Sequence, residues 1–279
     1  MSRFLKSLSY LTVALALSAC VNADSVDLES RAISLDQNAE PAGAAGQVAS
    51  ASVAQLLPST GPTYVTLTVS QLQNGTGTNA NPITKRAITS GSGFVVSRDG
   101  FVMTAAHVAV AKGNEISARA ANGRVYSGSV IGINLNNDMA VVKLRGFTGH
   151  AVAPAGPGCM VKGDLVYTLG KPHGGGDTAR VGALEDLHFG RPVAYGKFGY
   201  PDAIVLHMGT QRGESGGPVF DGKGKLIGMV VSTLSDTNGQ SINLAHAIPA
   251  NTLANYLCSQ TSCASAWSAL ASKQTDSCG

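Results

Sequence analysis

The sequence predicts an all-β protein, built as a barrel or a sandwich. Short runs of β-forming residues, separated by Gly, Asn, Asp and Pro, fill most of the chain from Gly91 onward. Glycine is abundant, with 34 residues, as a fold with many tight turns requires. A convincing amphipathic helix is found mainly near the end, over about residues 251–271. Many short strands followed by one terminal helix favour a β architecture over an alternating α/β fold.

The strands can be placed one by one. The first pair is a hairpin formed by residues 94–96 and 101–103, with the turn signal Asp99-Gly100 between them. Further strands are expected at 124–133, 139–144, 164–169, 203–208, 217–220, 225–232 and 242–248, with turn candidates at Asp221-Gly222 and Asn238-Gly239. Residues 71–90 are polar and are interpreted as a loop between strands.

The N-terminus has the pattern of an export signal. Arg3 and Lys6 precede a short apolar run, which is too short to span a bilayer by itself. The segment 17–20 resembles a bacterial lipobox, in which Cys20 would be lipidated; ordinary cleavage after Ala23 is the alternative. We therefore expect a lipoprotein-type signal peptide at 1–19 and a flexible tether at 20–60. The location would be the bacterial cell envelope, as a periplasmic or outer-membrane lipoprotein, or the medium.

Export also sets the interpretation of the cysteines, because exported proteins mature in an oxidising compartment. With Cys20 lipidated or removed, four disulfide candidates remain, Cys159, Cys258, Cys263 and Cys278, and three pairings stay open. No histidine pair lies at ligand spacing beside them, so we expect no metal site and no cofactor. The formal charge of +3 and the absence of a Lys/Arg-rich run argue against a nucleic-acid partner.

Three short segments carry candidate chemistry. His107 closes the block Thr104–Val108, Asp138 leads into an apolar strand, and Ser215 lies in the glycine-rich block Gly213–Pro218. A serine hydroxyl needs a positioned base to act as a nucleophile, and the oxyanion that forms needs N–H donors. His107 would be that base, Asp138 would orient it, and the backbone N–H groups of Gly213 and Ser215 would form the oxyanion hole. Each residue alone fits an ordinary structural role; their order and flanking patterns together favour catalysis.

These blocks resemble the chymotrypsin-like serine peptidases, and most closely the protease domain of the bacterial HtrA/Deg family. The similarity covers about residues 90–250 and includes the stretches 91–107, 161–174, 211–215 and 247–249. It implies a chymotrypsin-like double six-stranded antiparallel β-barrel with a short C-terminal helix. It also implies a serine endopeptidase that cleaves protein or peptide substrates through an acyl-enzyme.

The resemblance divides the chain into a peptidase domain at 61–255 and a helical, cysteine-containing tail at 256–279. Only about thirty residues follow Pro249, so we expect no PDZ domain of the kind that is typical of the HtrA branch. We therefore expect a monomer and not the oligomeric assembly of that branch.

The family's layout also suggests where specificity resides. Gly209 would lie near the base of the pocket that holds the residue before the scissile bond, with Ser232, Thr233 and His246 along its walls. A glycine at the base provides no charge for Lys or Arg. His246 would either donate to an acidic residue or simply pack against a strand. Glu214, which precedes the candidate nucleophile, is interpreted as exposed or paired locally with Arg212.

Two other classes of protein remain. The pattern Gly213-x-Ser215-x-Gly217 also fits the nucleophile elbow of α/β-hydrolase esterases, with Asp236 and His246 following in that order. That elbow requires a parallel sheet with alternating helices, which the strand-rich sequence does not favour. The third possibility is a non-catalytic surface-binding lipoprotein, which would have no need of an intact triad.

Overall fold

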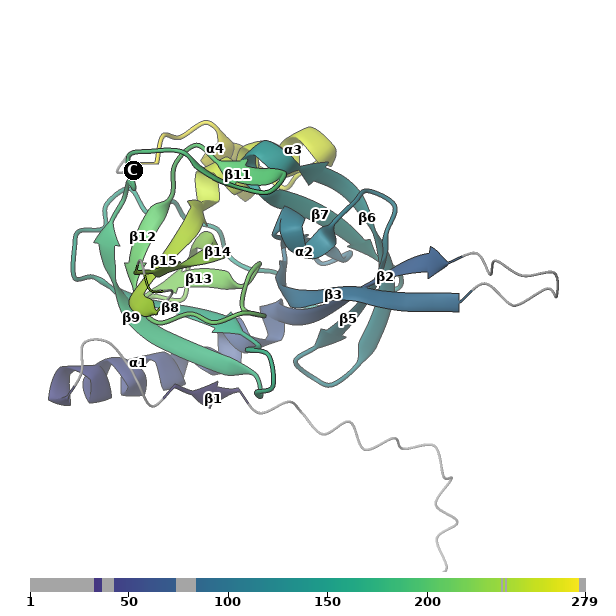
Figure 1. Ribbon diagram of the computed structural model, residues 1–279. Helices are drawn as coiled ribbons and strands as arrows, with labels where there is room; N and C mark the ends of the chain where they lie inside the picture. Colours follow the sequence, from purple (N-terminus) through teal and green to yellow (C-terminus); the bar gives the residue numbers. More distant parts are fainter. Residues whose placement is uncertain (1–32, 37–42, 74–83, 237, 239, 276–279) are drawn as a thin grey trace, which may run out of the picture.

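The computed structural model describes residues 33–36, 43–73, 84–236, 238 and 240–275, and most of these residues form two β-barrels side by side (Figure 1). The first barrel is closed in the order β2-β3-β4-β7-β6-β5, and all of its pairings are antiparallel. Its strands are β2 (Tyr64–Gln73), β3 (Thr84–Val95), β4 (Phe101–Thr104), β5 (Glu115–Ala120), β6 (Val125–Asn134) and β7 (Met139–Leu144).

The second barrel follows along the chain. Its order is β9-β12-β15-β14-β13-β8, and pairing of β8 with β9 closes the ring. Its strands are β8 (Leu165–Gly170), β9 (Thr178–Asp186), β12 (Ile204–His207), β13 (Pro218–Asp221), β14 (Leu226–Ser235) and β15 (Ser241–Pro249). The predicted double six-stranded barrel is thus confirmed. The esterase alternative is wrong, because the strands of both barrels pair antiparallel and the elbow needs a parallel sheet.

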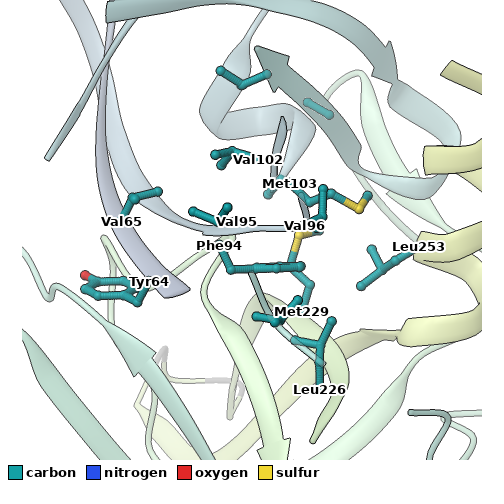
Figure 2. Close-up of a cluster of buried hydrophobic side chains, with 14 of the residues drawn as sticks. Tyr64, Val65, Phe94, Val95, Val96, Val102, Met103, Leu226, Met229 and Leu253 are labelled. Carbon is teal, nitrogen blue, oxygen red and sulfur yellow. The ribbon is translucent and has the colours of Figure 1, made fainter. Parts of the chain in front are cut away.

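The buried core runs continuously between the barrels. In Figure 2, Phe94 and Met103 from the first barrel lie close to Leu226 and Met229 from the second. Leu253, from the C-terminal helical region, joins the same cluster and is fully buried. The two barrels therefore pack as one hydrophobic unit.

The C-terminal helix is broken into two. The helix α3 (Ala250–Gln260) ends before an extended residue, Thr261, and α4 (Ser265–Ala271) follows. A disulfide joins Cys258 in α3 to Cys263 in the connection before α4, with Cα atoms 5.0 Å apart. The single predicted helix over 251–271 is therefore wrong in its middle. Trp267 is almost completely buried, and its indole N–H donates to the Val96 carbonyl at 3.1 Å, which fixes α4 against the first barrel.

The N-terminal region departs from the expected tether at 20–60. Residues Ala44–Thr60 form the helix α1, the 3-10 turn η1 (Gly61–Thr63) follows, and β1 (Ser34–Leu35) pairs parallel with β9. Val53, a residue of α1, is fully buried. Figure 1 shows α1 and β1 lying along one side of the second barrel. The tether interpretation is wrong for these described residues, because tertiary burial stabilises a helix whose own sequence is only weakly amphipathic.

Two further expectations can be compared with the structure. The polar loop expected at 71–90 is shorter, because β2 continues to Gln73 and β3 begins at Thr84. The signal segment and Cys20 lie outside the described residues. Within the part of the chain that the structure describes, no helix has the length and apolar character needed to cross a bilayer.

Candidate active site

His107 lies on a short helical turn at the edge of the first barrel. The turn is α2 (Ala106–Ala109), which follows directly after β4. The Nδ1 atom of His107 lies 2.7 Å from Asp138 Oδ2, and its backbone N–H donates to Asp138 Oδ1 at 2.9 Å. The imidazole is 25% exposed, so it is fixed on the Asp138 side and remains accessible. The structure therefore brings together the first two members of the predicted triad.

Asp138 is held by the turn that precedes β7. The 3-10 turn η2 (Leu135–Asn137) is capped by Asn134, whose side chain accepts hydrogen bonds from two backbone N–H groups of the turn. Asp138 then adopts a left-handed conformation, with φ at 44°, which aspartate tolerates better than most residues. Its side chain is completely buried, and a buried carboxylate requires several donors.

A third donor comes from a separate two-stranded hairpin, which lies between β9 and β12 in the sequence. The hairpin of β10 (Val193–Tyr195) and β11 (Phe198–Tyr200) places the Tyr195 hydroxyl against Asp138 Oδ2, to which it donates. The edge of the Tyr195 ring meets the His107 ring, with centroids 5.9 Å apart. Burial raises the pKa of Tyr195 well above its usual range, with the Asp138 charge adding to the shift, so the hydroxyl keeps its proton.

Sequence analysis missed this hairpin, although a signal for it is present. Tyr195 and Phe198 flank the two-residue connection Gly196-Lys197, and Gly196 has a φ of 59°. Aromatic residues on both sides of a glycine-containing two-residue loop are typical of a tight hairpin.

The candidate nucleophile lies on the loop between β12 and β13. Ser215 is half-buried, and its carbonyl accepts from the Ser92 backbone N–H at 2.9 Å. Gly216 has a φ of 83°, and a Cβ added there would lie 2.2 Å from the Ser92 carbonyl oxygen and 2.4 Å from Thr104 Oγ1. The loop therefore packs directly on β3 and on the end of β4, which leads into the turn that carries His107.

Several backbone donors on this loop are engaged: the Glu214 N–H donates to the Gln211 carbonyl at 3.1 Å, and the Gly216 N–H donates to the Val230 carbonyl at 2.8 Å. In the described residues, neither the Gly213 N–H nor the Ser215 N–H donates a hydrogen bond, while the Gly213 carbonyl accepts from Ser92 Oγ at 2.9 Å. Within the same residues, no hydrogen bond joins Ser215 Oγ to His107. Such a bond is often long before substrate binds. Two N–H groups and one hydroxyl of this loop are therefore not engaged by other described residues.

Glu214 differs from its predicted role. Its side chain is completely buried, and both carboxylate oxygens accept from Arg180 Nε at 2.7 Å. Arg212, the expected local partner, is exposed. Desolvation raises the pKa of Glu214, and Arg180 opposes that shift. The prediction of an exposed or locally paired Glu214 is therefore wrong, because the sequence cannot show that β9 brings an arginine beneath the nucleophile loop.

The predicted specificity residues fall into two groups. Gly209 faces Asn243, whose Oδ1 would lie 2.9 Å from a Cβ added at Gly209. Thr233 shares a hydrogen bond of 2.6 Å with Thr210, which lies on the nucleophile loop. These two positions therefore lie around the segment that leads to Ser215.

Ser232 and His246 belong instead to a buried network. The Tyr200 hydroxyl lies 2.7 Å from Ser232 Oγ and 2.8 Å from His246 Nδ1. His246 is completely buried, and its ring lies 4.2 Å from that of Phe189. Desolvation lowers the pKa of His246 to about 4, so the ring is neutral at neutral pH. This environment favours the packing alternative for His246 over a role as a charged donor in the pocket.

A hollow of about 320 Å³ lies next to the nucleophile loop on the side of β3. Ser90, Gly91, Lys171 and His173 contribute to its lining. The backbone N–H of His173 donates to the Arg212 carbonyl at 2.8 Å, which connects this wall to the Ser215 loop. The hollow therefore adjoins the loop that carries Ser215.

The remaining site predictions concern the cysteines. Cys258 and Cys263 are paired, and Cys159 is also disulfide-bonded. Cys20 and Cys278 lie outside the described residues.

Comparison with known proteins shows sequence similarity to serine peptidases. A family model described as a trypsin-like peptidase domain matches residues 91–229. A protein of Brucella suis biovar 1 (strain 1330) named "Probable periplasmic serine endoprotease DegP-like" is 34% identical over 182 residues, covering 64% of this chain and 34% of its own. A protein of the same name from Bartonella henselae is 33% identical over 168 residues, covering 60% and 32%. The chain thus spans about a third of the length of the curated relatives it matches.

Solved structures support the fold. The HtrA-type protease AlgW with decapeptide superposes with a TM-score of 0.62 at 24% identity, covering 74% of this chain and 66% of the other. The MamO protease domain from Magnetospirillum magneticum, in its apo form, gives a TM-score of 0.54 at 19% identity, covering 71% and 97%.

Proposed function

We propose that this chain, which belongs to the trypsin-like peptidases and is homologous to the HtrA/DegP proteases, is a serine endopeptidase with His107, Asp138 and Ser215 as its catalytic triad. One observation carries the proposal. The buried Asp138 carboxylate accepts both the backbone N–H and the Nδ1–H of His107. That arrangement fixes the imidazole tautomer with its Nε2 free to act as a base.

The chemistry follows from these groups. His107 Nε2 removes the Ser215 hydroxyl proton as Oγ attacks the peptide carbonyl, and the developing oxyanion binds to the N–H groups of Gly213 and Ser215. The C–N bond then breaks, and His107 delivers its proton to the leaving amine. Water, deprotonated by His107 in turn, hydrolyses the ester and restores Ser215. Support for the oxyanion hole comes from the two N–H groups that make no hydrogen bond in the described residues.

For specificity, we propose that Gly209 and Thr233 shape the site for the residue before the scissile bond. Neither carries a charge, so trypsin-like preference for Lys or Arg is not expected. Ser232 and His246 would not contact the residue before the scissile bond, since both are engaged by Tyr200. A cleavage profile without basic preference, altered by Thr233→Val and unaltered by His246→Phe, is the expected result. Dominant cleavage after Lys or Arg would contradict it.

For location, we propose export, with Cys20 as a lipid attachment point. The signal-like residues 1–19 and the lipobox-like segment support this, as do relatives that are named periplasmic. Metabolic labelling with a fatty-acid probe, lost in Cys20→Ser, tests lipidation. Labelling that persists in Cys20→Ser would contradict it, as would a mature N-terminus at residue 24.

The endopeptidase proposal is tested with a fluorophosphonate probe and a peptide library. We expect one adduct, on Ser215, and peptide cleavage that vanishes in Ser215→Ala. Ser117→Ala, an exposed serine on β5, is the matched control and should retain both properties. Binding of peptides with no adduct and no cleavage would instead favour the surface-binding lipoprotein.

A further inference from the structure

A buried ion network connects the N-terminal segment to the nucleophile loop. Arg180, on β9, contacts Glu214 through Nε and Asp36 through Nη1. The Glu214 side chain is completely buried, that of Arg180 is 7% exposed and that of Asp36 is 15% exposed. One guanidinium therefore joins two carboxylates that lie 178 positions apart in the sequence (214 − 36).

Glu214 occupies a sensitive position in this network. It lies between Gly213 and Ser215, the two residues whose N–H groups we assign to the oxyanion hole. Its carboxylate accepts from Arg180 and also from the Gln211 backbone N–H, so it ties the start of the loop to β9. If the cation that pairs with a buried carboxylate is displaced, the carboxylate is left as an unpaired buried charge, which is strongly destabilising. The position of Glu214 thus depends on the position of Arg180.

Asp36 fixes Arg180 from the opposite end. The residues before it, Ser34 and Leu35, pair parallel with β9 as β1. The Ser34 backbone N–H donates to the Asp177 carbonyl at 3.0 Å, and the Asp36 backbone N–H donates to the Ala179 carbonyl at 2.9 Å. The segment 34–36 is therefore docked along the strand that carries Arg180, with its carboxylate directed at the guanidinium.

We propose that the segment 34–36 is a positioning element of the active site, which holds the oxyanion hole in shape through Asp36, Arg180 and Glu214. The inference rests on the proposed endopeptidase function. None of the three side chains needs to touch substrate; they act through the backbone of Gly213 and Ser215. Undocking of the N-terminal segment would then switch activity off while both barrels remain folded.

The test compares Asp36→Ala and Asp36→Asn in the full chain. Glu185→Gln is the matched control, because Glu185 is also an acid ion-paired to a basic residue, Lys162, but on the far end of β9. Four quantities are measured: kcat and KM on a peptide substrate, the Ki of a peptide boronic acid, and the Ki of the corresponding product peptide. The boronate forms a tetrahedral adduct whose oxyanion needs the oxyanion hole, whereas the product peptide forms no tetrahedral adduct and depends on the hole far less.

We expect Asp36→Ala to lower kcat and weaken the boronate by about tenfold or more, while KM and product affinity change by less than about threefold. Asp36→Asn, which keeps an oxygen toward Arg180, should lie between Asp36→Ala and the wild type. Hydrogen exchange at the Gly213 and Ser215 amides should rise in Asp36→Ala and stay unchanged in Glu185→Gln.

Wild-type kcat and boronate affinity in Asp36→Ala would overturn the inference, as would parallel losses of boronate and product binding that simply follow a lower melting temperature. The proposed function fails separately, if the wild-type chain itself shows no peptide cleavage and no adduct on Ser215. In that case the amide exchange still tests whether Asp36 shapes the loop, and unchanged exchange would overturn the positioning role.

Discussion

Replacing Tyr195 by phenylalanine removes one of the three hydrogen bonds that the Asp138 carboxylate accepts. The other two come from the backbone N–H and the Nδ1–H of His107. Because the pKa of Tyr195 is raised by burial, its hydroxyl is a proton donor throughout the working pH range. The substitution leaves the ring, and therefore its edge contact with His107, in place.

The size of the effect follows from the charge and burial of Asp138. A hydrogen bond to a charged group contributes about 1.5–3 kcal/mol. Two donors remain, so we use the lower end, which corresponds to about a tenfold loss in kcat. KM should change little, since the Tyr195 hydroxyl would act on His107 through Asp138 and not through the substrate.

The assay is steady-state cleavage of a peptide substrate by Tyr195→Phe, with melting temperatures measured in parallel. Tyr126→Phe is the matched control: this tyrosine is buried against Phe147 in the first barrel, and no described hydrogen bond involves its hydroxyl. It should keep wild-type kcat. Unchanged kcat in Tyr195→Phe, or a loss carried entirely by KM, would refute the assigned role of the hydroxyl.

Three other perturbations have defined outcomes. Gly216→Ala places a Cβ 2.4 Å from Thr104 Oγ1 at a φ of 83°, so activity should fall about a hundredfold or more as the loop shifts; wild-type activity would contradict this packing. The pKa of His246 is about 4 when folded and 6.5 when exposed, so the unfolded chain binds the proton first. The contribution of His246 to the free energy of unfolding should therefore decrease by up to about 3 kcal/mol as pH falls from about 6.5 to about 4. Urea titrations of His246→Phe should lack this part of the acid slope, and an unchanged slope would contradict it. Removing the Cys258–Cys263 disulfide by double serine substitution opens a short loop and should lower the free energy of unfolding by about 2 kcal/mol; a change near zero would show that α3 and α4 dock without it.

The sequence predicted what depends on local signals. The hairpin around Asp99-Gly100 has a glycine with a φ of 92° at its turn, and the strands that flank it carry buried Phe94 and Met103. The turn-forming residues and the strand-forming residues both lie within one short segment, so the sequence alone predicts these elements. The flanking patterns and chain order of His107 and Asp138 predict that they act together, and the structure brings them within hydrogen-bond distance.

What escaped prediction depends on contacts between distant segments. The helix α1 is rich in Ala and Ser, and its stability comes from burying residues such as Val53 against the second barrel. The strand β1 has only two residues and no local signal. The Arg180–Glu214 pair and the Tyr195–Asp138 contact join residues 34 and 57 positions apart. Side-chain partners of this kind are decided by the closed barrels and the packing between them, and no periodicity in the sequence encodes them.

The central claim, that His107, Asp138 and Ser215 form an acyl-transfer triad, is tested most directly by trapping the intermediate. The full chain is mixed with an activated ester of a good peptide substrate, quenched in acid within the first turnover, digested and analysed by mass spectrometry. We predict an acyl group on Ser215 that accumulates in a burst. It should be absent in Ser215→Ala and form far more slowly in His107→Ala. Substrate turnover without any acyl group on Ser215, or with the acyl group on another residue, would contradict the account.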